Sequence, residues 1–584
     1  MRLIEIRLLE GPSVYRLQPV VKVEVAIGRR RTWFGQRIPA RHALVRLGAG
    51  VPARDWPEPV ITLAGWARRL RSARGEGIGG IRAHRSSDPG HWILTWPWVG
   101  AERARLVAEA AASLTDRAAT PARRARLTGS QERLLAQWTD RIRQASASPP
   151  SWIRDTDRRI PIISISGTNG KSTTTRLITR ILLLAGRRVG TTTSDGVLVD
   201  ERMVDPGDWT GPGGAHQILA RSDVDVAVLE TARGGLVLKG LGYESNDASI
   251  LTNVSSDHLD VQGIHTLPEL AEVKATICRI TKPDGWVILS ADDPFVRAVA
   301  RTVRARVALF SHRGAVSTPM RRHLAAGGRA YLVRRGELGE AEGDRWTPIA
   351  GVREVPITMG GLAGHNIANA LAAAAGARAL GASHDEVRRG LLDFRPNAEE
   401  SPGRMNIFRN GGRVAIVDFA HNEAGLEAVL DVAEGIAGGA GGRVTPITVI
   451  VGTAGDRPDD TLRGMGRIAA RRAQRLAFKE TLGYLRGRSR EAVVGELRAG
   501  ANLGGWTRDI PIYETEVAAL RAELNGAAAA ADGSRHDAAR IVVLLCHEDR
   551  TGVFALLRDL HFRPVETAAD LISLAPRLED RPRR

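Results

Sequence analysis

Residues 163–176 read ISISGTNGKSTTTR, and this run constrains the fold more than any other stretch of the chain. An apolar, β-rich segment meets a glycine turn, a lysine and then four consecutive hydroxyl residues. At the start of a helix, backbone N–H groups bind phosphate because the helix dipole and the unpaired donors point to the same place. The usual P-loop has a glycine five residues before its Gly-Lys pair, whereas Ile165 stands there in this chain. The run therefore predicts a strand, a phosphate loop with shifted glycine spacing, and a helix.

The residue types in this loop suit a nucleotide. Glycines let the backbone approach the phosphates, Lys171 can reach the terminal phosphates, and Ser172 can bind Mg²⁺. The alternative is an ordinary glycine-rich turn after a strand, but the Lys-Ser pair and the flanking elements favour a phosphate site. The residues expected to hold the nucleotide are Gly167, Thr168, Asn169, Gly170, Lys171, Ser172 and Thr173.

Strands and helices alternate after this loop. Apolar runs at 224–230, 248–254 and 286–294 are separated by helical patterns, which implies βα units and a parallel sheet with its loops at one edge. Residues 318–355 are irregular and are expected to form a small β insertion, and 365–380 form an alanine-rich helix. A second set of strands follows SPGR, with the sequences RVAIVDFA, PITVIVG, RLAFKE and IVVLLC.

A chain of 584 residues is too long for one core. The expected fold class is α/β, with a P-loop-containing central domain, a Rossmann-like C-terminal domain and a small α+β N-terminal domain. The expected boundaries are 1–117 for the basic N-terminal domain, 118–155 for a helix and linker, 156–400 for the central ATP-binding domain and 401–584 for the C-terminal domain.

The net charge of +18 is concentrated near the start of the chain. Residues 1–150 hold 26 lysines and arginines against 12 acidic residues, an excess of +14. Arginine binds carboxylate and phosphate through a rigid fork, so one interpretation of this excess is a site for an acidic polymer or for nucleic acid. Arginine-rich solvated surfaces from a GC-rich genome are an equally open explanation.

Several classes of protein are disfavoured. Two distant cysteines, Cys278 and Cys546, allow neither a disulfide framework nor a four-cysteine zinc site. No apolar stretch reaches the roughly 18 residues of a membrane span, and the N-terminus lacks a signal-peptide core. Aromatic residues make up 4%, without the paired aromatic strands of RNA binders. A cytoplasmic protein that binds neither membrane nor nucleic acid is expected.

Three further residues are candidates for metal binding. Glu230 ends a strand at the same sheet edge as the loop, where a carboxylate can hold the ion that bridges nucleotide phosphates. His258 follows the next strand, and Lys274 lies beside the apolar stripe of the helix after it. Taken singly, such a histidine is more often a cap or a core residue, and such a lysine is more often solvated.

The order of the motifs decides between these readings. GTNGKS, Glu230, a DH pair, a helical lysine, HNxxN at 365–369, PGR at 402–404, DFAHN at 418–422 and GDR at 455–457 occur in one chain. The sequence resembles the Mur ligase superfamily, the ATP-dependent amide ligases of peptidoglycan and folylpolyglutamate synthesis, which uses the GTNGK[ST] form of the loop.

The resemblance narrows to the cyanophycin synthetase family. TTTSDGVLVD, VLETARGGLVLKGLGY and LTNVSSDHLD are similar to its ligase half, and EGPSVYRLQPVVKVEV and SSDPGHW are similar to its start. That family carries an ATP-grasp domain between these two regions, and residues 118–152 take its place here.

What the resemblance implies is an ADP-forming ligase that phosphorylates a carboxylate and lets an amine attack the acyl phosphate. ATP and two Mg²⁺ ions are the expected cofactors, with Ser172 and Glu230 on the first ion, and His258 and a carbamylated Lys274 on the second. Asn366 and Asn369 are expected to bind the nucleotide from a helix. The resemblance also implies that Arg404 and Asp418 contact ATP from the C-terminal domain, with Asp418 on the ribose, and that His421 and Asn422 lie at the cleft. The residues expected to serve catalysis are Lys171, His258, Lys274, Arg404 and His421.

The expected substrates are an acidic peptide or polymer and an amino acid such as arginine. A separate protein with an ATP-grasp domain is one candidate partner, since this chain alone is not expected to extend a polyaspartate backbone. An oligomer is compatible with the sequence. Two other classes stay open: a non-catalytic Mur-like scaffold that binds a polyanion, and a simple P-loop NTPase or kinase, which would not need the HNxxN, PGR and DFAHN elements.

Overall fold

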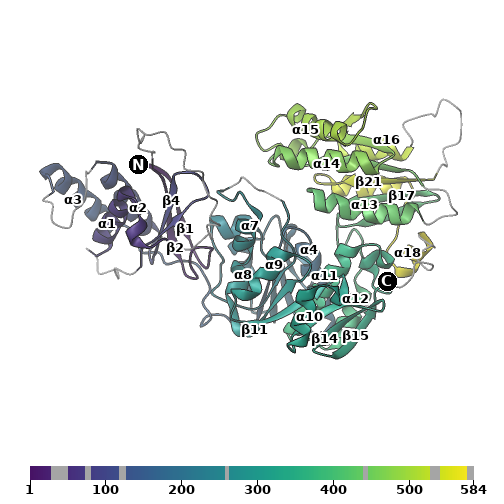
Figure 1. Ribbon diagram of the computed structural model, residues 1–584, viewed down its shortest axis with the longest axis horizontal. Coiled ribbons are helices and arrows are strands. Elements are labelled where there is room, and N and C mark those ends of the chain that lie inside the picture. Colours follow the sequence, from purple (N-terminus) through teal and green to yellow (C-terminus); the bar gives the residue numbers. More distant parts are fainter. Residues whose placement is uncertain are drawn as a thin grey trace.

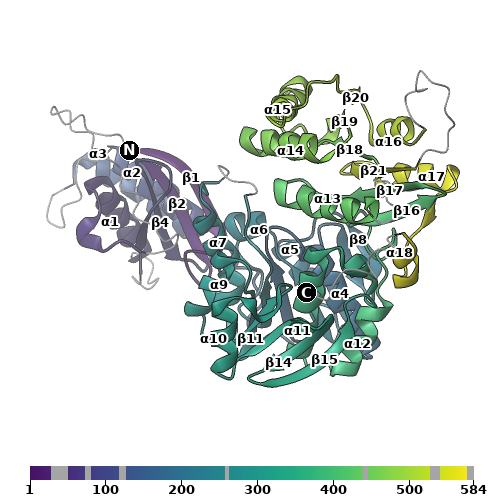
Figure 2. The ribbon, with the colours of Figure 1, turned by 45° about the vertical axis from the view of Figure 1, so that its right-hand side comes forward.

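A computed structural model of the chain describes residues 1–27, 50–72, 80–117, 127–256, 262–438, 445–525 and 539–574. The N-terminal part and the C-terminal part lie on different sides of a larger central domain (Figure 1). In the turned view the C-terminal part still lies above the central domain, with the N-terminal part beside it (Figure 2). No helix in these ranges has the length and apolar content needed to cross a bilayer.

The N-terminal domain is a four-stranded antiparallel sheet packed against helices. The sheet order is β1-β2-β4-β3, formed by β1 (Arg2–Leu9), β2 (Val20–Ala26), β3 (Arg82–Arg85) and β4 (His91–Pro97). The helices are α1 (Glu58–Ser72), α2 (Ala101–Arg117) and α3 (Gly129–Gln144). Ile142 of α3 is buried in the same core as α2, so this helix of the expected 118–155 segment packs on the N-terminal domain rather than in a linker.

The central domain is built on one sheet of eleven strands. Their order is β15-β14-β13-β12-β11-β10-β5-β9-β6-β7-β8. The strands are β5 (Ile162–Ser166), β6 (Val189–Thr192), β7 (Gly196–Val199), β8 (Arg202–Pro206), β9 (Val226–Glu230), β10 (Asn246–Leu251), β11 (Thr281–Ser290), β12 (Arg306–Ser311), β13 (Arg329–Arg334), β14 (Glu337–Glu342) and β15 (Arg345–Gly351). The helices are α4 (Lys171–Leu184), α5 (Pro212–Leu219), α6 (Arg233–Leu238), α7 (Leu267–Lys274), α8 (Thr276–Arg279), α9 (Pro294–Ala298), α10 (Thr318–Ala325), α11 (Gly364–Ala379) and α12 (His384–Asp393).

The position of β5 sets the place of the site. All five residues of β5 are buried, and the strand pairs in parallel with β9 on one side and β10 on the other. The strands up to β9 lie on one side of β5, and the chain then crosses over to form β10 on the other side. Such a switch in strand order leaves a crevice at the carboxyl ends of the strands. The expected small β insertion at 318–355 is instead a continuation of the main sheet, because β13 pairs in parallel with β12 and carries β14 and β15 beyond it.

The C-terminal domain is a second, separate α/β unit. Its sheet order is β20-β19-β18-β21-β17-β16-β22. The strands are β16 (Asn406–Asn410), β17 (Arg413–Asp418), β18 (Ile447–Val451), β19 (Arg475–Lys479), β20 (Ile512–Tyr513), β21 (Arg540–Leu545) and β22 (Arg563–Pro564). The helices are α13 (Glu423–Ala437), α14 (Asp459–Arg472), α15 (Arg490–Leu503), α16 (Glu516–Asn525), α17 (Arg550–Asp559) and α18 (Ala568–Leu574). The four strands expected from the sequence are β17, β18, β19 and β21.

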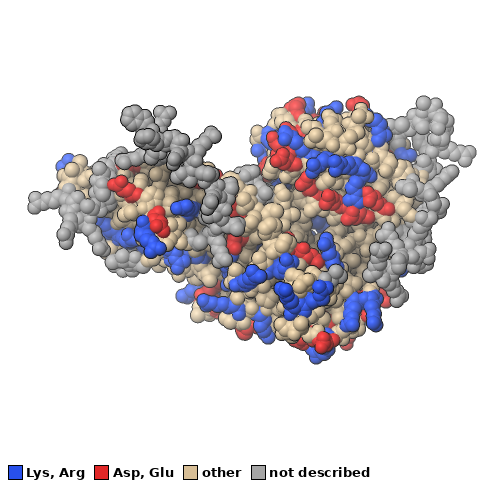
Figure 3. Space-filling model, in the orientation of Figure 1, with Lys and Arg blue, Asp and Glu red and all other residues tan. Residues whose placement is uncertain are grey.

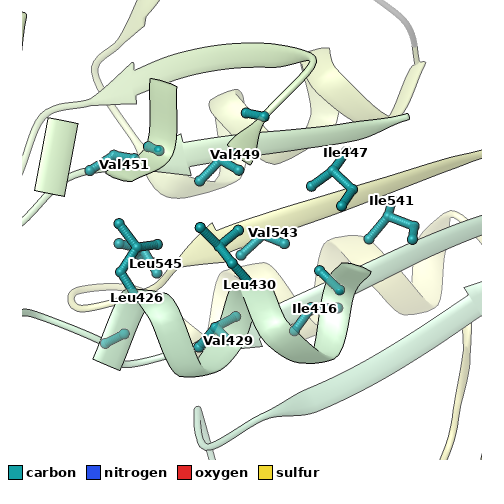
Figure 4. Close-up of a cluster of buried hydrophobic side chains, with 14 of the residues drawn as sticks. Ile416, Leu426, Val429, Leu430, Ile447, Val449, Val451, Ile541, Val543 and Leu545 are labelled. Carbon is teal, nitrogen blue, oxygen red and sulfur yellow. The ribbon is translucent and has the colours of Figure 1, made fainter. Parts of the chain in front are cut away.

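The core of this domain follows from the helical spacing of apolar residues on α13. Leu426, Val429 and Leu430 lie on one face, as expected for positions three and four residues apart. They point toward strand side chains that include Ile416 and Val543 (Figure 4). This packing holds the start of α13 against the end of β17, where the C-terminal domain meets the cleft described below.

We expect Leu430→Ala to destabilise the C-terminal domain by about 2–5 kcal/mol, since the side chain is fully buried and its loss leaves a cavity. The measurement is hydrogen exchange of the β17 and β21 amides, which reports this domain separately from the others. Leu503→Ala is the matched control, because Leu503 is 66% exposed. Equal effects of the two substitutions would contradict the assigned core.

Candidate functional site

A cleft of about 1260 Å³ lies between the central and C-terminal domains. It is lined by the loops that follow β5, β9 and β10, by the start of α11, and by residues around the end of β17 and the start of α13. Among the described residues expected to serve the site, all except Gly167 and Asn422 line this cleft: Thr168, Asn169, Gly170, Lys171, Ser172, Thr173, Glu230, Lys274, Asn366, Asn369, Arg404, Asp418 and His421. His258 falls within 257–261, outside the described residues, and stays a prediction.

The glycines of the loop are required by close contacts. A Cβ on Gly167 would lie 1.9 Å from Thr252 Oγ1, and a Cβ on Gly170 would lie 2.2 Å from Asn369 Oδ1. Gly170 also has a φ of 84° as the residue that starts α4, a conformation that favours glycine. The two glycines therefore let β10 and α11 press against the loop from both sides.

Asn253, just after β10, holds the loop through three hydrogen bonds. Its carbonyl oxygen accepts from Thr168 N–H at 2.8 Å, its Oδ1 accepts from Asn169 N–H at 2.9 Å, and its Nδ2 donates to Asn169 O at 2.9 Å. Sequence reasoning did not single out Asn253. Its position was nevertheless informative, because it is a polar residue directly after β10, the strand that pairs with β5.

Glu230 is buried at the floor of the cleft without full hydrogen bonding. It is 3% exposed, and its Oε2 has no hydrogen-bond partner among the described residues. Burial raises the pKa of Glu230, and the nearby Lys171 ammonium and Ser172 hydroxyl only partly offset this effect. This carboxylate oxygen and the neighbouring serine hydroxyl are oxygen ligands of the kind that a hard divalent cation such as Mg²⁺ prefers.

The two lysines of the site both reach the loop. Lys171 Nζ donates to Thr168 O at 2.9 Å, so the side chain folds back over the loop that it follows. Lys274, the last residue of α7, is 4% exposed, and its Nζ donates to Gly167 O at 2.7 Å. The sequence predicted one helix around Lys274; the structure divides this segment into α7 and α8, with Ala275 between them.

Asn366 and Asn369 lie one turn apart on α11. Asn369 Nδ2 donates to Asn366 Oδ1 at 3.0 Å, which orients both amides. Beside them, burial lowers the pKa of His365 to about 4, so this imidazole is neutral at pH 7. The helix start thus presents uncharged polar groups to the cleft.

The C-terminal domain supplies charged and aromatic groups around Asp418. The Asp418 carboxylate accepts from Met405 N–H at 2.7 Å and from Ala420 N–H at 2.8 Å. Burial raises the pKa of Asp418, against the opposing effect of the Arg404 guanidinium. Arg404 lies over the Phe419 ring at 4.4 Å, and His421 Nδ1 lies 3.1 Å from Phe419 O. Arg404 and Asp418 are therefore brought together on one wall of the cleft.

Two contacts join the domains across the cleft. Asn169 of the loop and Asn422, the residue that caps α13, exchange amide hydrogen bonds at 3.2 and 3.1 Å. Asp195, after β6, pairs with Arg176 of α4 at 3.0 Å and with Arg550 of α17 at 2.9 Å. Burial opposes ionisation of Asp195, but neighbouring arginines outweigh it and lower the pKa of this carboxyl. Neither Asp195 nor Arg550 was predicted, because ion pairs between distant segments leave no local pattern.

Two family models match this chain. The Mur ligase middle domain matches residues 165–377, and the Mur ligase glutamate ligase domain matches residues 403–550. The chain therefore carries the middle and C-terminal domains of the Mur ligases.

Individual relatives carry the comparison further. A cyanophycin synthetase of Nostoc sp. is 41% identical over 338 residues, which are 57% of this chain and 37% of that protein. A UDP-N-acetylmuramoylalanine–D-glutamate ligase of Symbiobacterium thermophilum is 36% identical over 237 residues, or 40% of this chain and 45% of the relative. The chain thus spans less than half the length of these relatives.

Among solved structures, a bifunctional folylpolyglutamate synthase/dihydrofolate synthase with Mn, AMPPNP and L-glutamate bound superposes with a TM-score of 0.48 at 20% identity. The superposition covers 69% of this chain and 89% of that one.

The buried Glu230 carboxyl, whose pKa is raised, gives a stability prediction with a defined sign. Because the pKa of Glu230 is raised in the folded state, its ionised form costs stability at neutral pH. We expect Glu230→Gln to raise the free energy of unfolding by about 1–3 kcal/mol at pH 7, and to lose this gain as the pH falls through the raised pKa. Urea unfolding at several pH values measures it.

Glu340→Gln is the matched control for this experiment. Glu340 is equally buried, but the Tyr331 hydroxyl and Arg378 outweigh burial and lower its pKa. Its loss should therefore destabilise the protein above the ordinary carboxyl pKa. A destabilising Glu230→Gln would show that the Glu230 carboxylate is satisfied in the folded protein.

Proposed function

We propose that this chain is an ATP-dependent, ADP-forming ligase that joins a carboxylic acid to an amine through an acyl phosphate. The observation that carries the proposal is Glu230: one of its buried carboxylate oxygens has no hydrogen-bond partner within the described ranges, and it lies beside the Lys171–Ser172 start of α4. A buried carboxylate oxygen without a hydrogen bond lowers the stability of the fold. This loss is explained if a cation binds that oxygen during turnover. A scaffold without turnover has no use for it.

In the proposed reaction the carboxylate of the acid attacks the γ-phosphorus of ATP, and the bond to the ADP oxygen breaks. The amine nitrogen then attacks the acyl carbon, the bond to phosphate breaks, and the amine loses a proton as the amide forms. Ser172 and Glu230 would hold a Mg²⁺ ion, which would neutralise charge on the phosphates.

This chain's own residues bind and orient the reactants. The loop N–H groups and Lys171 hold the phosphates, and the start of α11 and Asp418 hold the nucleoside from both domains. Breaking the Lys171 contact with Thr168 O frees its ammonium for the terminal phosphate. Asn169 and Asn422 hold the two domains together around the nucleotide, which positions the acid and the amine for attack.

The acid that we propose is an acidic peptide or polymer, and the amine is an amino acid such as arginine. Basic side chains gather over α9 and α10, on the face of the central domain below the cleft (Figure 3). Arg301 ends the short turn after α9, Arg304 follows it, and Arg321 and Arg322 lie on α10; all four are exposed. Exposed guanidinium groups on the central domain, together with the basic N-terminal domain, suit a chain of carboxylates.

The first test of this function is Lys171→Ala, assayed in a screen of acid and amine pairs. We expect ADP to form only when both acid and amine are present, more efficiently for long acidic chains than for short ones, and the variant to lose this activity by at least about 100-fold. Lys239→Ala, which removes an exposed lysine, is the control. ADP release without an acid and an amine would identify a simple NTPase instead, and no release with any pair would sink the ligase proposal.

A second test addresses Lys274. An ammonium at this buried position would repel a nearby cation, whereas a carbamate would supply an anionic oxygen, so we propose that Lys274 is carbamylated. The carbamate nitrogen keeps one N–H for Gly167 O. We expect ¹³C-bicarbonate to give a carbamate NMR signal that is absent from Lys274→Met. The same signal in both proteins would exclude Lys274 as its source.

A further inference from the structure

The turn between β3 and β4 is the SSDPGH segment of the N-terminal domain, and it is firmly built. Asp88 N–H donates to Ser86 Oγ at 3.3 Å, and His91 N–H donates to Asp88 O at 3.1 Å. His91 Nδ1 also lies 3.0 Å from Glu24 Oε1 on β2, which ties the end of the turn to the sheet. The turn is thus a rigid projection of the N-terminal domain.

Two side chains of this turn bind the central domain next to α7. Asp88 Oδ1 lies 2.9 Å from His265 Nε2, and Ser87 Oγ donates to Glu269 Oε1. Both views place α7 beside the N-terminal sheet (Figures 1 and 2). The side chains of Asp88 and His265 are 37% and 32% exposed, so the pair adds little stability and acts mainly through geometry.

The residue bound by Ser87 also starts the helix. Glu269 is the acidic member of the capping box of α7: its Oε2 accepts from the N–H groups of His265 and Thr266 at 2.8 and 2.9 Å. Five residues further on, the same helix ends at Lys274, whose Nζ donates to Gly167 O at the start of the phosphate loop. A continuous line of contacts therefore runs from the N-terminal domain, through the α7 cap, to Lys274 and the loop.

We propose that Ser87 and Asp88 are positioning residues for the ligase site: they fix the start of α7 and thereby hold Lys274 against the phosphate loop. The N-terminal domain then has a part in turnover that is separate from any hold on an acidic polymer. This inference rests on the proposed ligase function.

The experiment compares the full chain with its Ser87→Ala/Asp88→Ala double variant. We expect kcat to fall about 10-fold, because a small misplacement of a group at the reacting centre is costly, while KM for ATP and for the acid stays within about 2-fold. Amide hydrogen exchange in 267–274 should become faster. The single variant Asp88→Asn keeps an oxygen acceptor for His265 and should therefore keep most of the kcat of the full chain. Asp55→Ala removes an exposed carboxylate of the same domain and should leave kcat and hydrogen exchange unchanged.

A double-mutant cycle between Asp88→Ala and His265→Ala completes the test, and we expect their effects on kcat to be non-additive. The proposal is overturned by unchanged kcat and exchange, by additive effects, or by a rise in KM for the acid in place of a fall in kcat, which would make the turn a substrate contact. Hydrogen exchange needs no turnover. If the unaltered chain joins no acid and amine, the ligase function fails while the contact through α7 is still decided by exchange.

Discussion

The backbone of the phosphate loop is held in place by hydrogen bonds from the two residues that directly follow β10. Asn253 satisfies Thr168 and Asn169 through both its main chain and its amide, and Thr252 Oγ1 donates to Asn169 O at 2.7 Å. Loop donors that point to a ligand can stay available only when the other polar groups of the loop are paired in this way. The two glycines follow from the same constraint, since any side chain at either position would displace β10 or α11.

Two buried carboxylates differ in how completely they are hydrogen-bonded. Glu516, 1% exposed in the C-terminal domain, binds Lys479 and accepts from the N–H groups of His547 and Asp549, so its lone pairs are well used. Glu230, at the cleft, has one oxygen without a hydrogen-bond partner in the part of the chain that the structure describes. Buried polar groups with incomplete hydrogen bonding are commonly found at functional sites, which is consistent with the role proposed for Glu230.

The central and C-terminal domains line the cleft and contact each other across it, and the N-terminal domain is attached to the central domain. The C-terminal domain reaches the loop through Asn422 and reaches α4 through Arg550 and Asp195. The N-terminal domain is attached along residues 10–12, where Glu10 N–H donates to Lys239 O and Leu241 N–H donates to Pro12 O, both at 2.8 Å. Gly11 makes this approach possible, because a Cβ there would lie 1.7 Å from Leu241 O. This attachment supports the proposed role of the β3–β4 turn in fixing the start of α7.

The sequence by itself determined the strand, loop and helix at 162–184, the alternation that builds two α/β domains, and the placement of Glu230 at the sheet edge that carries the loop. These follow from local causes: the spacing of apolar residues, the glycine turn and the start of a helix. Only the tertiary structure decided that Asn253 grips the loop, that β13–β15 extend the main sheet, that α3 packs on the N-terminal domain, and that Asp195 meets Arg550. Each of these is a contact between segments distant in the chain. Strand order and domain docking depend on which surfaces pack against each other. The local spacing of apolar residues does not determine that packing.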